Sequence, residues 1–455
     1  MENKTALQSL AAYVHGANEI DTKVHAAVTL HVIDTIGAWI AGAHSAEGKA
    51  LVSFRRQMRA QSGAAQSILT DVMTNCAVAR LSEIDDIHLA SMTTPGSIII
   101  PAALTLGISV EKDADAEAFA AAVAVGYEVM ARLGAAIDGP SALYRGIWPT
   151  LWATPIGVAA VGSRLWGLSE EQTAHALAMA LTFSAPGVGQ AGGVTTSRWY
   201  SIGNAARDGV AAAMAAQHGF TSDLMLLDGN FLPSVYNIKP NLAAVIEGLG
   251  TPAITRTSFK PWCAARQTMA ATTAFKDLRK VIDVEDILAV EAFVLPPHLK
   301  MVDHGIVEGD RMSYLTSLPY QIAASALAPE SGFDIGKTKP FMSESLRAMI
   351  AKVKVTPDDC LLADYPRTWP ARVMISAKSG RYELAVSHVP GDPERPFDLQ
   401  QVQGKFRRLL NPVIGKADCE AIFALALGTG DDGEAPGLLL RRMEQIYDTV
   451  LARPQ

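Results

Sequence analysis

Cysteine, aromatic residues and charge are all scarce in this chain. Its 455 residues include four cysteines, 7% aromatic residues and 19% charged residues. The cysteines stand at Cys76, Cys263, Cys360 and Cys419, and no two of them form a Cys-x-x-Cys pair. This spacing argues against zinc or an iron–sulfur cluster held by thiolates. We therefore expect reduced thiols and no metal.

Basic runs interleaved with aromatic residues are also absent, and the net charge is -7. Nucleic acid is therefore not an expected partner. The first residues, Met1–Lys4, lack the basic and then apolar pattern of a signal peptide, which favours a cytoplasmic location. One uncharged stretch, Leu89–Val110, is long enough to span a bilayer. Its early prolines and hydroxyl residues instead favour a buried loop followed by a core helix, so no membrane span is expected.

Alanine and glycine are abundant, and such small residues let helices approach closely. Hydrophobic periodicity predicts helices over Val24–Ala43, Asp113–Ala136 and Ala205–His218. A capping box formed by Ser169 and Gln172 opens a further helix that should end near Thr182. The core is therefore predicted to be mainly helical.

The pattern changes after Trp262. Strands are predicted over Ile287–Leu295, Lys352–Val355, Ala371–Lys378 and Arg381–Val386, the last two as a hairpin. Helical periodicity returns over Leu399–Leu410 and Cys419–Leu427. The predicted fold is mainly α, with a large all-helical domain (residues 1–264 and 396–455). A smaller α+β lid domain (residues 265–395) is inserted into it.

The segment Gly187–Gly192 matches the Gly-x-Gly-x-x-Gly fingerprint of dinucleotide-binding proteins. That fingerprint requires a strand before it and a helix after it. Here a long Ala/Leu helix precedes it, and Gly193 and Val194 follow. A packed or flexible glycine loop is the better interpretation. Because no His-Glu-x-x-His pattern occurs either, we expect no cofactor.

Three carboxylates and an imidazole lie within the segment Ser82–His88. If this segment is helical, Asp85 and His88 share a face through their i,i+3 spacing. A carboxylate paired with an imidazole fixes the tautomer and raises its basicity. A solvated acidic helix end, or an aspartate that caps the following loop, is the alternative.

Two apolar stretches of the sequence contain positively charged residues. Arg198 precedes a predicted helix, whose N-terminus suits an anion, and its guanidinium can clamp a carboxylate. The alternative is a surface arginine stacked on Trp199. Lys260 and Arg266 lie in an aromatic stretch, where a buried lysine beside a second cation can act as a base. The alternative is a lysine that extends past Trp262 to solvent.

Five segments together resemble the 2-methylcitrate dehydratase (MmgE/PrpD) family, which also includes cis-aconitate decarboxylase and iminodisuccinate epimerase. They are Glu83–Ala103, Gly146–Ala160, Arg198–Gly219, Phe259–Arg266 and Ser317–Ala323. In the same order they resemble the family's D-F-D-D-x-H…H-P-G, G-x-H-x-T, K-x-x-H-x-G-x-A-A, F-K-x-Y-x-C and F-S-x-x-Y-x-V-A blocks. They keep the family order across about 240 residues. The resemblance implies a helical domain with an α+β lid.

The departures from these blocks concern histidines above all. Thr94 stands where the family has the histidine before Pro-Gly, and Trp148 replaces the histidine of G-x-H-x-T. Ser201 and Gln267 stand at or near two further histidine positions, and Arg198 takes the place of a lysine. Methylcitrate and cis-aconitate are therefore not the expected substrates.

The resemblance implies proton movement at a carbon next to a carboxylate. Such chemistry needs a base near the carbon and cations that hold the developing charge. The residues of the acidic and aromatic segments that fit the family pattern are Asp85, Asp86, His88, Lys260 and Tyr320. Lys260 is the candidate base, Tyr320 or Tyr200 the candidate acid, and Asp86 with His88 would orient or relay. The candidate substrate-binding residues are Arg198, Arg266, Thr94, Trp148 and Tyr200, and Lys260 and Arg198 are expected to face one pocket.

Three functions remain open. The family favours a lyase that dehydrates or decarboxylates a small di- or tricarboxylate. The missing histidines favour an epimerase or isomerase of the iminodisuccinate type. A non-catalytic carboxylate-binding relative is the third. A homodimer is expected, because the resemblance implies it and because a charge-poor Ala/Gly surface favours association.

Overall fold

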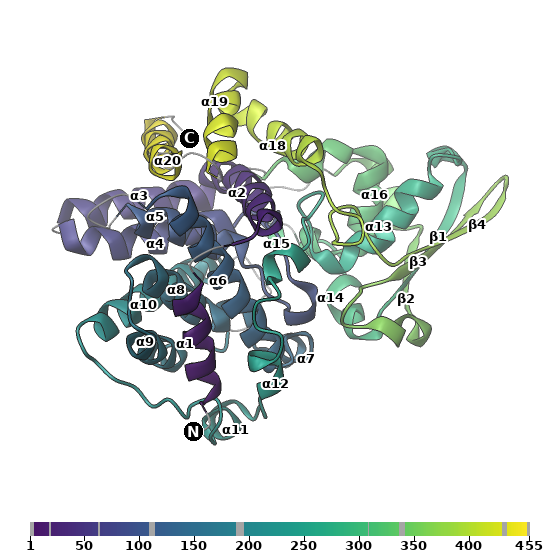
Figure 1. Cartoon of the computed structure of the whole chain (residues 1–455). Coiled ribbons are helices and arrows are strands. Elements are labelled where there is room, and N and C mark those ends of the chain that lie inside the picture. The colour runs from purple at the N-terminus through teal and green to yellow at the C-terminus, as the bar shows by residue number, and fades with distance from the viewer. Residues whose placement is uncertain are drawn as a thin grey trace. The chain divides into compact units, whose positions relative to one another are not determined.

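The computed structural model describes residues 4–17, 20–61, 64–108, 114–187, 195–307, 309–335, 342–429 and 435–452. The chain forms two compact units (Figure 1). The first comprises Met1–Gly189, Thr196–Thr257 and Asp398–Gln455, and the second comprises Gln190–Thr195 and Ser258–Phe397.

The first unit is helical. Its helices are α1 (Ala6–Gly16), α2 (Thr22–Ala43), α3 (Ala46–Gln61), α4 (Ala64–Arg80), α5 (Gly96–Gly107), α6 (Ala116–Ala136), α7 (Gly139–Tyr144), α8 (Pro149–Leu165), α9 (Glu170–Thr182), α10 (Ser197–Gln217), α11 (Phe231–Tyr236), α12 (Leu242–Ile246), α18 (Leu399–Ile414), α19 (Lys416–Gly428) and α20 (Ala435–Ala452). Short 3-10 turns lie at Leu89–Ser91 and Ala253–Arg256. The predicted mainly helical core is confirmed.

Short sequence patterns predicted where several helices begin or end. The capping box of α9 is formed by Ser169 and Gln172, and the helix ends at Thr182 as predicted. For α10 the prediction was wrong at one end, because the helix begins at Ser197 and not at Ala205. Arg198 therefore does not precede the helix but lies in its first turn, and its side chain leaves from the helix surface.

Glycines set the depth at which α10 packs. A Cβ on Gly203 would lie 2.4 Å from the backbone oxygen of Met73 in α4. A Cβ on Gly209 would lie 2.3 Å from the backbone oxygen of Pro155 in α8. Because real Cβ atoms do not approach oxygen so closely, only glycine allows α10 to lie against α4 and α8 at this distance. This contact fixes the helix that carries Arg198.

Within the part of the chain that the structure describes, two helices, α2 and α6, are long and apolar enough to cross a membrane by length and composition alone. However, 78% and 89% of their apolar windows are buried, and core helices of soluble proteins pass the same test. The uncharged stretch from Leu89 forms a short turn and then α5, which is buried along its whole length. The predicted buried loop and core helix are confirmed for residues 89–108.

The second unit holds a four-stranded sheet with strand order β2-β1-β3-β4. The strands are β1 (Ile287–Val294), β2 (Val353–Pro357), β3 (Ala371–Ala377) and β4 (Gly380–Val386). β1 and β2 are parallel, and the other neighbours are antiparallel. All four predicted strands and the β3–β4 hairpin are confirmed.

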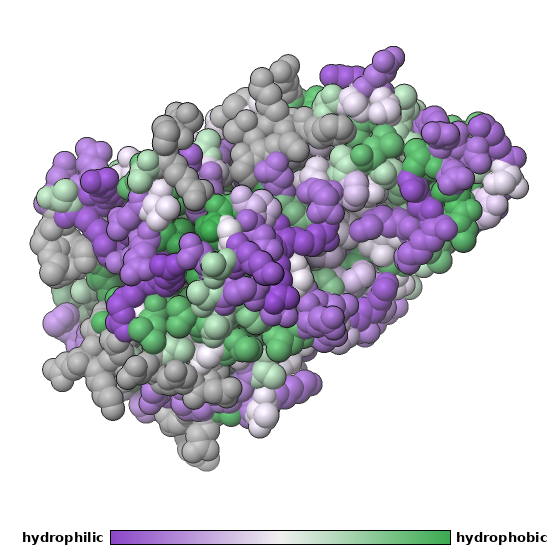
Figure 2. All heavy atoms as spheres, turned by 90° about the horizontal axis from the view of Figure 1, so that it is seen from above, coloured by the Kyte–Doolittle hydropathy of each residue, from purple (hydrophilic) through white to green (hydrophobic). Residues whose placement is uncertain are grey.

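Alternate residues of β3 are buried, so one face of this strand looks towards the core of the second unit. Helix α13 (Arg266–Leu278) packs against β3 and β4, and α16 (Leu318–Leu327) packs against α13. The remaining helices are α14 (Leu299–Val302), α15 (Arg311–Thr316) and α17 (Glu344–Ile350). A large helical part with a smaller α+β part is the fold class that the sequence predicts. Hydrophilic residues cover much of the molecular face drawn in Figure 2, with smaller hydrophobic groups between them.

Candidate functional site

The segment between α4 and α5 is a buried loop. The shared helix face considered for Asp85 and His88, which depended on a helix in this segment, is therefore not formed. Two non-glycine residues of the loop, Glu83 and Met92, adopt the left-handed conformation, with φ of 58° and 57°. Such backbone positions are uncommon outside glycine and gather at functional sites. The loop is thus a candidate site on geometry as well as on sequence.

Asp86 is buried and bound from three sides. Its Oδ1 accepts a 2.8 Å hydrogen bond from the backbone N–H of Gly96, the first residue of α5. Its Oδ2 accepts a 2.6 Å bond from the Tyr127 hydroxyl and lies 2.8 Å from Nδ1 of His31. Burial and the charge of Asp86 raise the pKa of Tyr127 well above its ordinary value, so the phenol stays protonated. These contacts hold the loop against α2, α5 and α6.

His88 is also buried. Its Nδ1 lies 2.9 Å from the hydroxyl oxygen of Ser91, and its backbone N–H donates to the carbonyl of Thr93. Burial, together with the positive charge of Arg256, lowers the pKa of His88 to about 4. The imidazole is therefore neutral at neutral pH. In this state it can accept a proton, but it carries no positive charge of its own.

Two of the segments that carry the resemblance meet at Thr94. Its backbone N–H donates to Oγ1 of Thr150 over 3.1 Å, and the two hydroxyl oxygens are 3.3 Å apart. Both residues are buried. Because Thr150 lies in the first turn of α8, two residues after Trp148, the contact joins the loop to the segment that carries Trp148.

Two arginines converge on the same two indole rings. The guanidinium carbon of Arg198 lies 4.8 Å from the ring centre of Trp148 and 4.7 Å from that of Trp199. The corresponding distances for Arg80 are 5.5 Å and 5.9 Å. Glu83 lies beside both, 3.0 Å from Arg80 and 3.8 Å from Arg198. We call these five residues the arginine cluster. The stacking of Arg198 on Trp199, proposed from sequence as the alternative to a carboxylate clamp, is therefore observed.

Arg80 is the member that sequence reasoning missed. It is the last residue of α4, follows an apolar run and precedes Glu83 by three residues. A charged residue isolated in this way could have indicated a site residue. Burial lowers the pKa of its guanidinium, but Asp85 and Glu83 outweigh burial and raise it. Asp85 in turn accepts a 2.7 Å hydrogen bond from Ser97. Arg80 thus remains a cation in a buried setting.

Tyr200 differs from the other candidates of the first unit. It is 43% exposed, and its ring lies edge-on to that of Phe54, with centres 5.9 Å apart. A phenol in this position is open to solvent.

In the second unit, Lys260 is 3% exposed. The backbone N–H of its neighbour Phe259 donates to the carbonyl of Gly391 and fixes this segment. The lysine that lies over Trp262 is Lys276, at 4.5 Å from the ring centre. Lys260 therefore does not extend to solvent, and the interpretation that took it past Trp262 to solvent is wrong.

Arg266 is the first residue of α13 and is buried. Its Nη2 donates to both carboxylate oxygens of Asp392, at 2.8 Å and 2.7 Å, and its guanidinium faces Trp369. Asp392 also accepts from the backbone N–H of Val389. The guanidinium predicted to clamp a substrate carboxylate thus already holds a carboxylate of the chain itself.

Tyr320 is buried, and its ring centre lies 5.7 Å from that of Tyr314. Burial raises the pKa of Tyr314 above its ordinary value. Nη2 of Arg311 lies 3.9 Å from Sγ of the buried Cys263. A phenol can donate a proton to a substrate oxygen, and a phenol and a guanidinium can both donate hydrogen bonds to one.

The described residues include no group of three His, Cys, Asp or Glu side chains that could hold a metal ion. Beyond Gly187, the Gly-x-Gly-x-x-Gly match lies outside the described residues.

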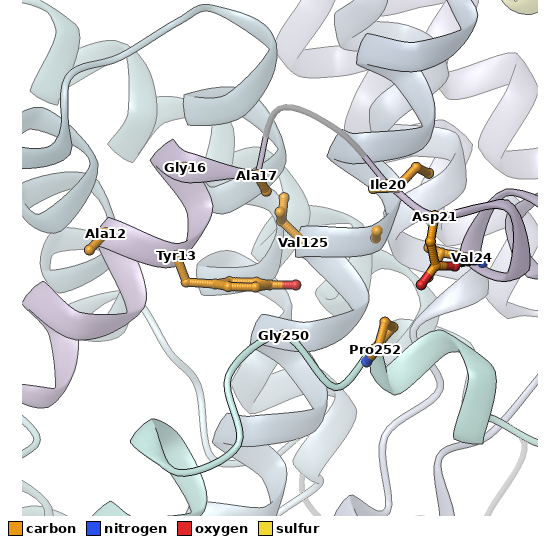
Figure 3. Close-up of a pocket in the computed structure, with 11 residues that line it drawn as sticks. Ala12, Tyr13, Gly16, Ala17, Ile20, Asp21, Val24, Val125, Gly250 and Pro252 are labelled. Atoms are coloured by element: carbon orange, nitrogen blue, oxygen red, sulfur yellow. Dashed lines mark hydrogen bonds between the residues drawn. The ribbon is translucent and has the colours of Figure 1, made fainter.

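A cavity of about 370 Å³ lies elsewhere in the first unit (Figure 3). Tyr13 extends into it from α1, and Asp21, Val24, Val125 and Pro252 surround the space. Burial and the charge of Glu128 raise the pKa of Tyr13 to about 12. No residue predicted to belong to the site lines this cavity.

Comparison with known families matches the chain at two places. The MmgE/PrpD N-terminal domain matches residues 8–235, and the MmgE/PrpD C-terminal domain matches residues 262–429. The chain belongs to the MmgE/PrpD family. A cis-aconitate decarboxylase-like protein of Aspergillus oryzae (strain ATCC 42149 / RIB 40) is 28% identical over 162 residues. The match spans 33% of this chain and 32% of that relative. Family membership supports a lyase-type enzymatic role without specifying the reaction or the substrate.

Proposed function

We propose that this chain is a cofactor-free lyase that moves a proton at a carbon next to a carboxylate of a small di- or tricarboxylate and expels water or carbon dioxide. Family membership and the partial similarity to a cis-aconitate decarboxylase-like protein support this class. The arginine cluster is the observation that supports a carboxylate as the substrate. Two guanidiniums beside indole rings form a fixed, weakly hydrated cationic surface of the kind that binds carboxylates and the charge of an enediolate.

In the proposed reaction, Lys260 takes the proton from the carbon. The C–H electron pair moves towards the carboxylate, and Arg198 holds the resulting negative charge. In a dehydration the hydroxyl group then leaves as water after receiving a proton from Tyr320. In a decarboxylation no C–H bond breaks first: the C–C bond to the departing carboxylate breaks as carbon dioxide leaves, Arg198 holds the resulting negative charge, and the carbon that keeps the electron pair then takes a proton from Tyr320. Asp86 and His88 position the loop that carries Glu83.

The test is proton NMR of a panel of di- and tricarboxylates incubated with the enzyme in deuterated water. A lyase gives deuterium exchange next to a carboxylate together with an alkene product or released carbon dioxide. Absence of exchange for every compound would contradict the proposal and favour a non-catalytic carboxylate-binding relative.

An epimerase of the iminodisuccinate type is the second candidate. It is favoured by Thr94 and Trp148, which stand where the family blocks have histidines. It is favoured also by the neutral state of His88, which therefore cannot act as an imidazolium acid at neutral pH. In the same NMR experiment an epimerase gives exchange and an inverted centre without loss of water or carbon dioxide.

We also propose that the protein is a cytoplasmic homodimer that needs neither a metal nor an organic cofactor. Light scattering at micromolar concentration tests the dimer, and a monomeric mass would contradict it. Metal analysis of active protein tests the second point, and a stoichiometric ion whose removal abolishes activity would contradict it.

A further inference from the structure

Glu83 occupies the position in the arginine cluster that suits a bound carboxylate. Its Oε2 lies 3.0 Å from Nη1 of Arg80, and its Oε1 lies 3.8 Å from Nη2 of Arg198. Each carboxylate oxygen therefore faces a different guanidinium. The Glu83 side chain is 8% exposed, so this pair of contacts is largely desolvated.

The two guanidiniums can make more hydrogen bonds than Glu83 provides. Among the described residues, Nε of Arg80 has no hydrogen-bond partner. Its Nη1 is shared between Glu83 and Asp85, with the Asp85 oxygen at 3.3 Å. An arginine offers five N–H donors in a planar fork that matches a carboxylate. The cluster therefore retains donor capacity for a second carboxylate.

The backbone of the loop is held by a contact that does not involve the arginine cluster, whereas the Glu83 side chain lies against Arg80 and Arg198. The buried Lys405 of α18 donates to the carbonyl of Ile84 over 2.9 Å, and the same amine pairs with Asp34 at 2.6 Å. Glu83 itself adopts a left-handed φ of 58°. An exchange of carboxylates at the arginines can thus move the Glu83 side chain while the Lys405 contact holds the loop backbone.

We infer that Glu83 is an internal competitor for the carboxylate group of the substrate: it holds Arg80 and Arg198 in register in the empty protein and is displaced when a substrate carboxylate binds. This inference rests on the proposed function for the identity of its ligand. Arg80 is then a second substrate-binding residue beside Arg198. Removal of the Glu83 charge should make any carboxylate bind more tightly, because the cluster loses its own anion.

The experiment is calorimetric titration of the full chain with succinate, a dicarboxylate without a leaving group. Glu83→Gln keeps the size of the side chain and removes its charge, and we expect roughly tenfold tighter binding of succinate. Arg80→Met should weaken succinate binding by a similar factor or more. Glu83→Asn serves as the second variant if Glu83→Gln fails to fold, because asparagine tolerates the left-handed conformation.

The matched control is Glu420→Gln. Glu420 forms a two-point pair with Arg407 on the surface of the first unit, at 2.7 Å and 2.8 Å. This variant removes the same charge from another arginine and should leave succinate binding within twofold of the parent protein. Equal or weaker binding in both Glu83 variants, or no detectable binding in any protein, would overturn the inference.

The deuterium-exchange assay separates this inference from the proposed function. Tighter succinate binding in the Glu83 variants without exchange of any compound supports the carboxylate competitor and contradicts the lyase. Exchange in the parent protein without tighter binding in the variants supports the lyase and contradicts the competitor.

Discussion

The hydroxyl of Tyr127 in α6 donates a 2.6 Å hydrogen bond to Oδ2 of Asp86 in the loop before α5. Both side chains are buried, and Asp86 also accepts from the backbone N–H of Gly96. A Cβ on Gly96 would lie 2.7 Å from both the Asp86 carboxylate and the Tyr127 hydroxyl, so only glycine fits there. Asp86 therefore holds the first residue of α5 in place.

Asp86→Asn should lower the free energy of unfolding by about 2–4 kcal/mol, because it weakens several buried charge-assisted hydrogen bonds at once. Urea denaturation measures this change. The control is Asp418→Asn, whose carboxylate is half-exposed beside Arg442 and should contribute less than about 0.5 kcal/mol. Unchanged stability together with lost turnover would show that Asp86 acts in the chemistry and not in positioning.

The buried His88 should make folding sensitive to mild acid. Burial and Arg256 lower its pKa from 6.5 to about 4 in the folded protein. Between these two values the unfolded chain binds a proton that the folded chain does not, so stability falls as the pH falls from 6.5 towards 4. The loss is about 3 kcal/mol, at 1.36 kcal/mol for each pKa unit. Above pH 6.5 this group contributes no pH dependence.

Denaturation of His88→Gln between pH 4 and 7 measures the effect. Its stability should vary less with pH than that of the parent protein, by about the same 3 kcal/mol across the range. His218→Gln is the control, because His218 is exposed and its loss should leave the pH dependence unchanged. Identical curves for His88→Gln and the parent protein would contradict the prediction.

The structural features that the sequence predicted are those that depend on residues close together along the chain. The strands near 287–295 and 371–386 and the capping box of Ser169 follow from local periodicity and spacing, and the structure confirms them. Side-chain partners that lie far apart in sequence could not be predicted in this way. Lys405 reaches the carbonyl of Ile84 across 321 positions, and Asp392 reaches Arg266 across 126.

The same limit explains the errors at the candidate site. Local spacing would pair Asp85 with His88 only on a helix, but the segment is fixed as a loop by contacts with Arg80, Ser97 and Ser91. Arg80 was missed because an arginine at the end of an apolar helix gives no sign of which rings it will face.

Lys260→Met should reduce kcat by roughly 100- to 10,000-fold and leave KM within a few-fold, as expected for loss of a general base. Steady-state kinetics on the compound found by NMR measures both constants. Lys276→Met is the matched control, since Lys276 is a lysine of the same unit that lies over Trp262. A rise in KM with unchanged kcat would assign Lys260 to binding.

Arg198→Met should raise KM by roughly 10- to 100-fold, because it removes one of the two guanidiniums of the arginine cluster. The control is Arg207→Met in the same helix, which removes a partly exposed guanidinium paired with Asp208. A fall in kcat at constant KM would contradict a role in ground-state binding.

Arg266 allows the structural and the substrate-binding roles to be separated, because its guanidinium is buried against Asp392. Arg266→Met should lower the free energy of unfolding by about 3–5 kcal/mol, since Asp392 is left buried without its cation. The double variant Arg266→Met/Asp392→Asn should recover much of this loss, because the amide oxygen can still accept from Val389 and no charge remains. Arg367→Met, which removes an exposed guanidinium paired with Asp364, should change stability by less than about 0.5 kcal/mol. If Arg266→Met is instead as stable as the parent protein and its KM rises tenfold, Arg266 binds the substrate, as the sequence predicts. Asp392 then only occupies the position of the substrate carboxylate in the empty protein.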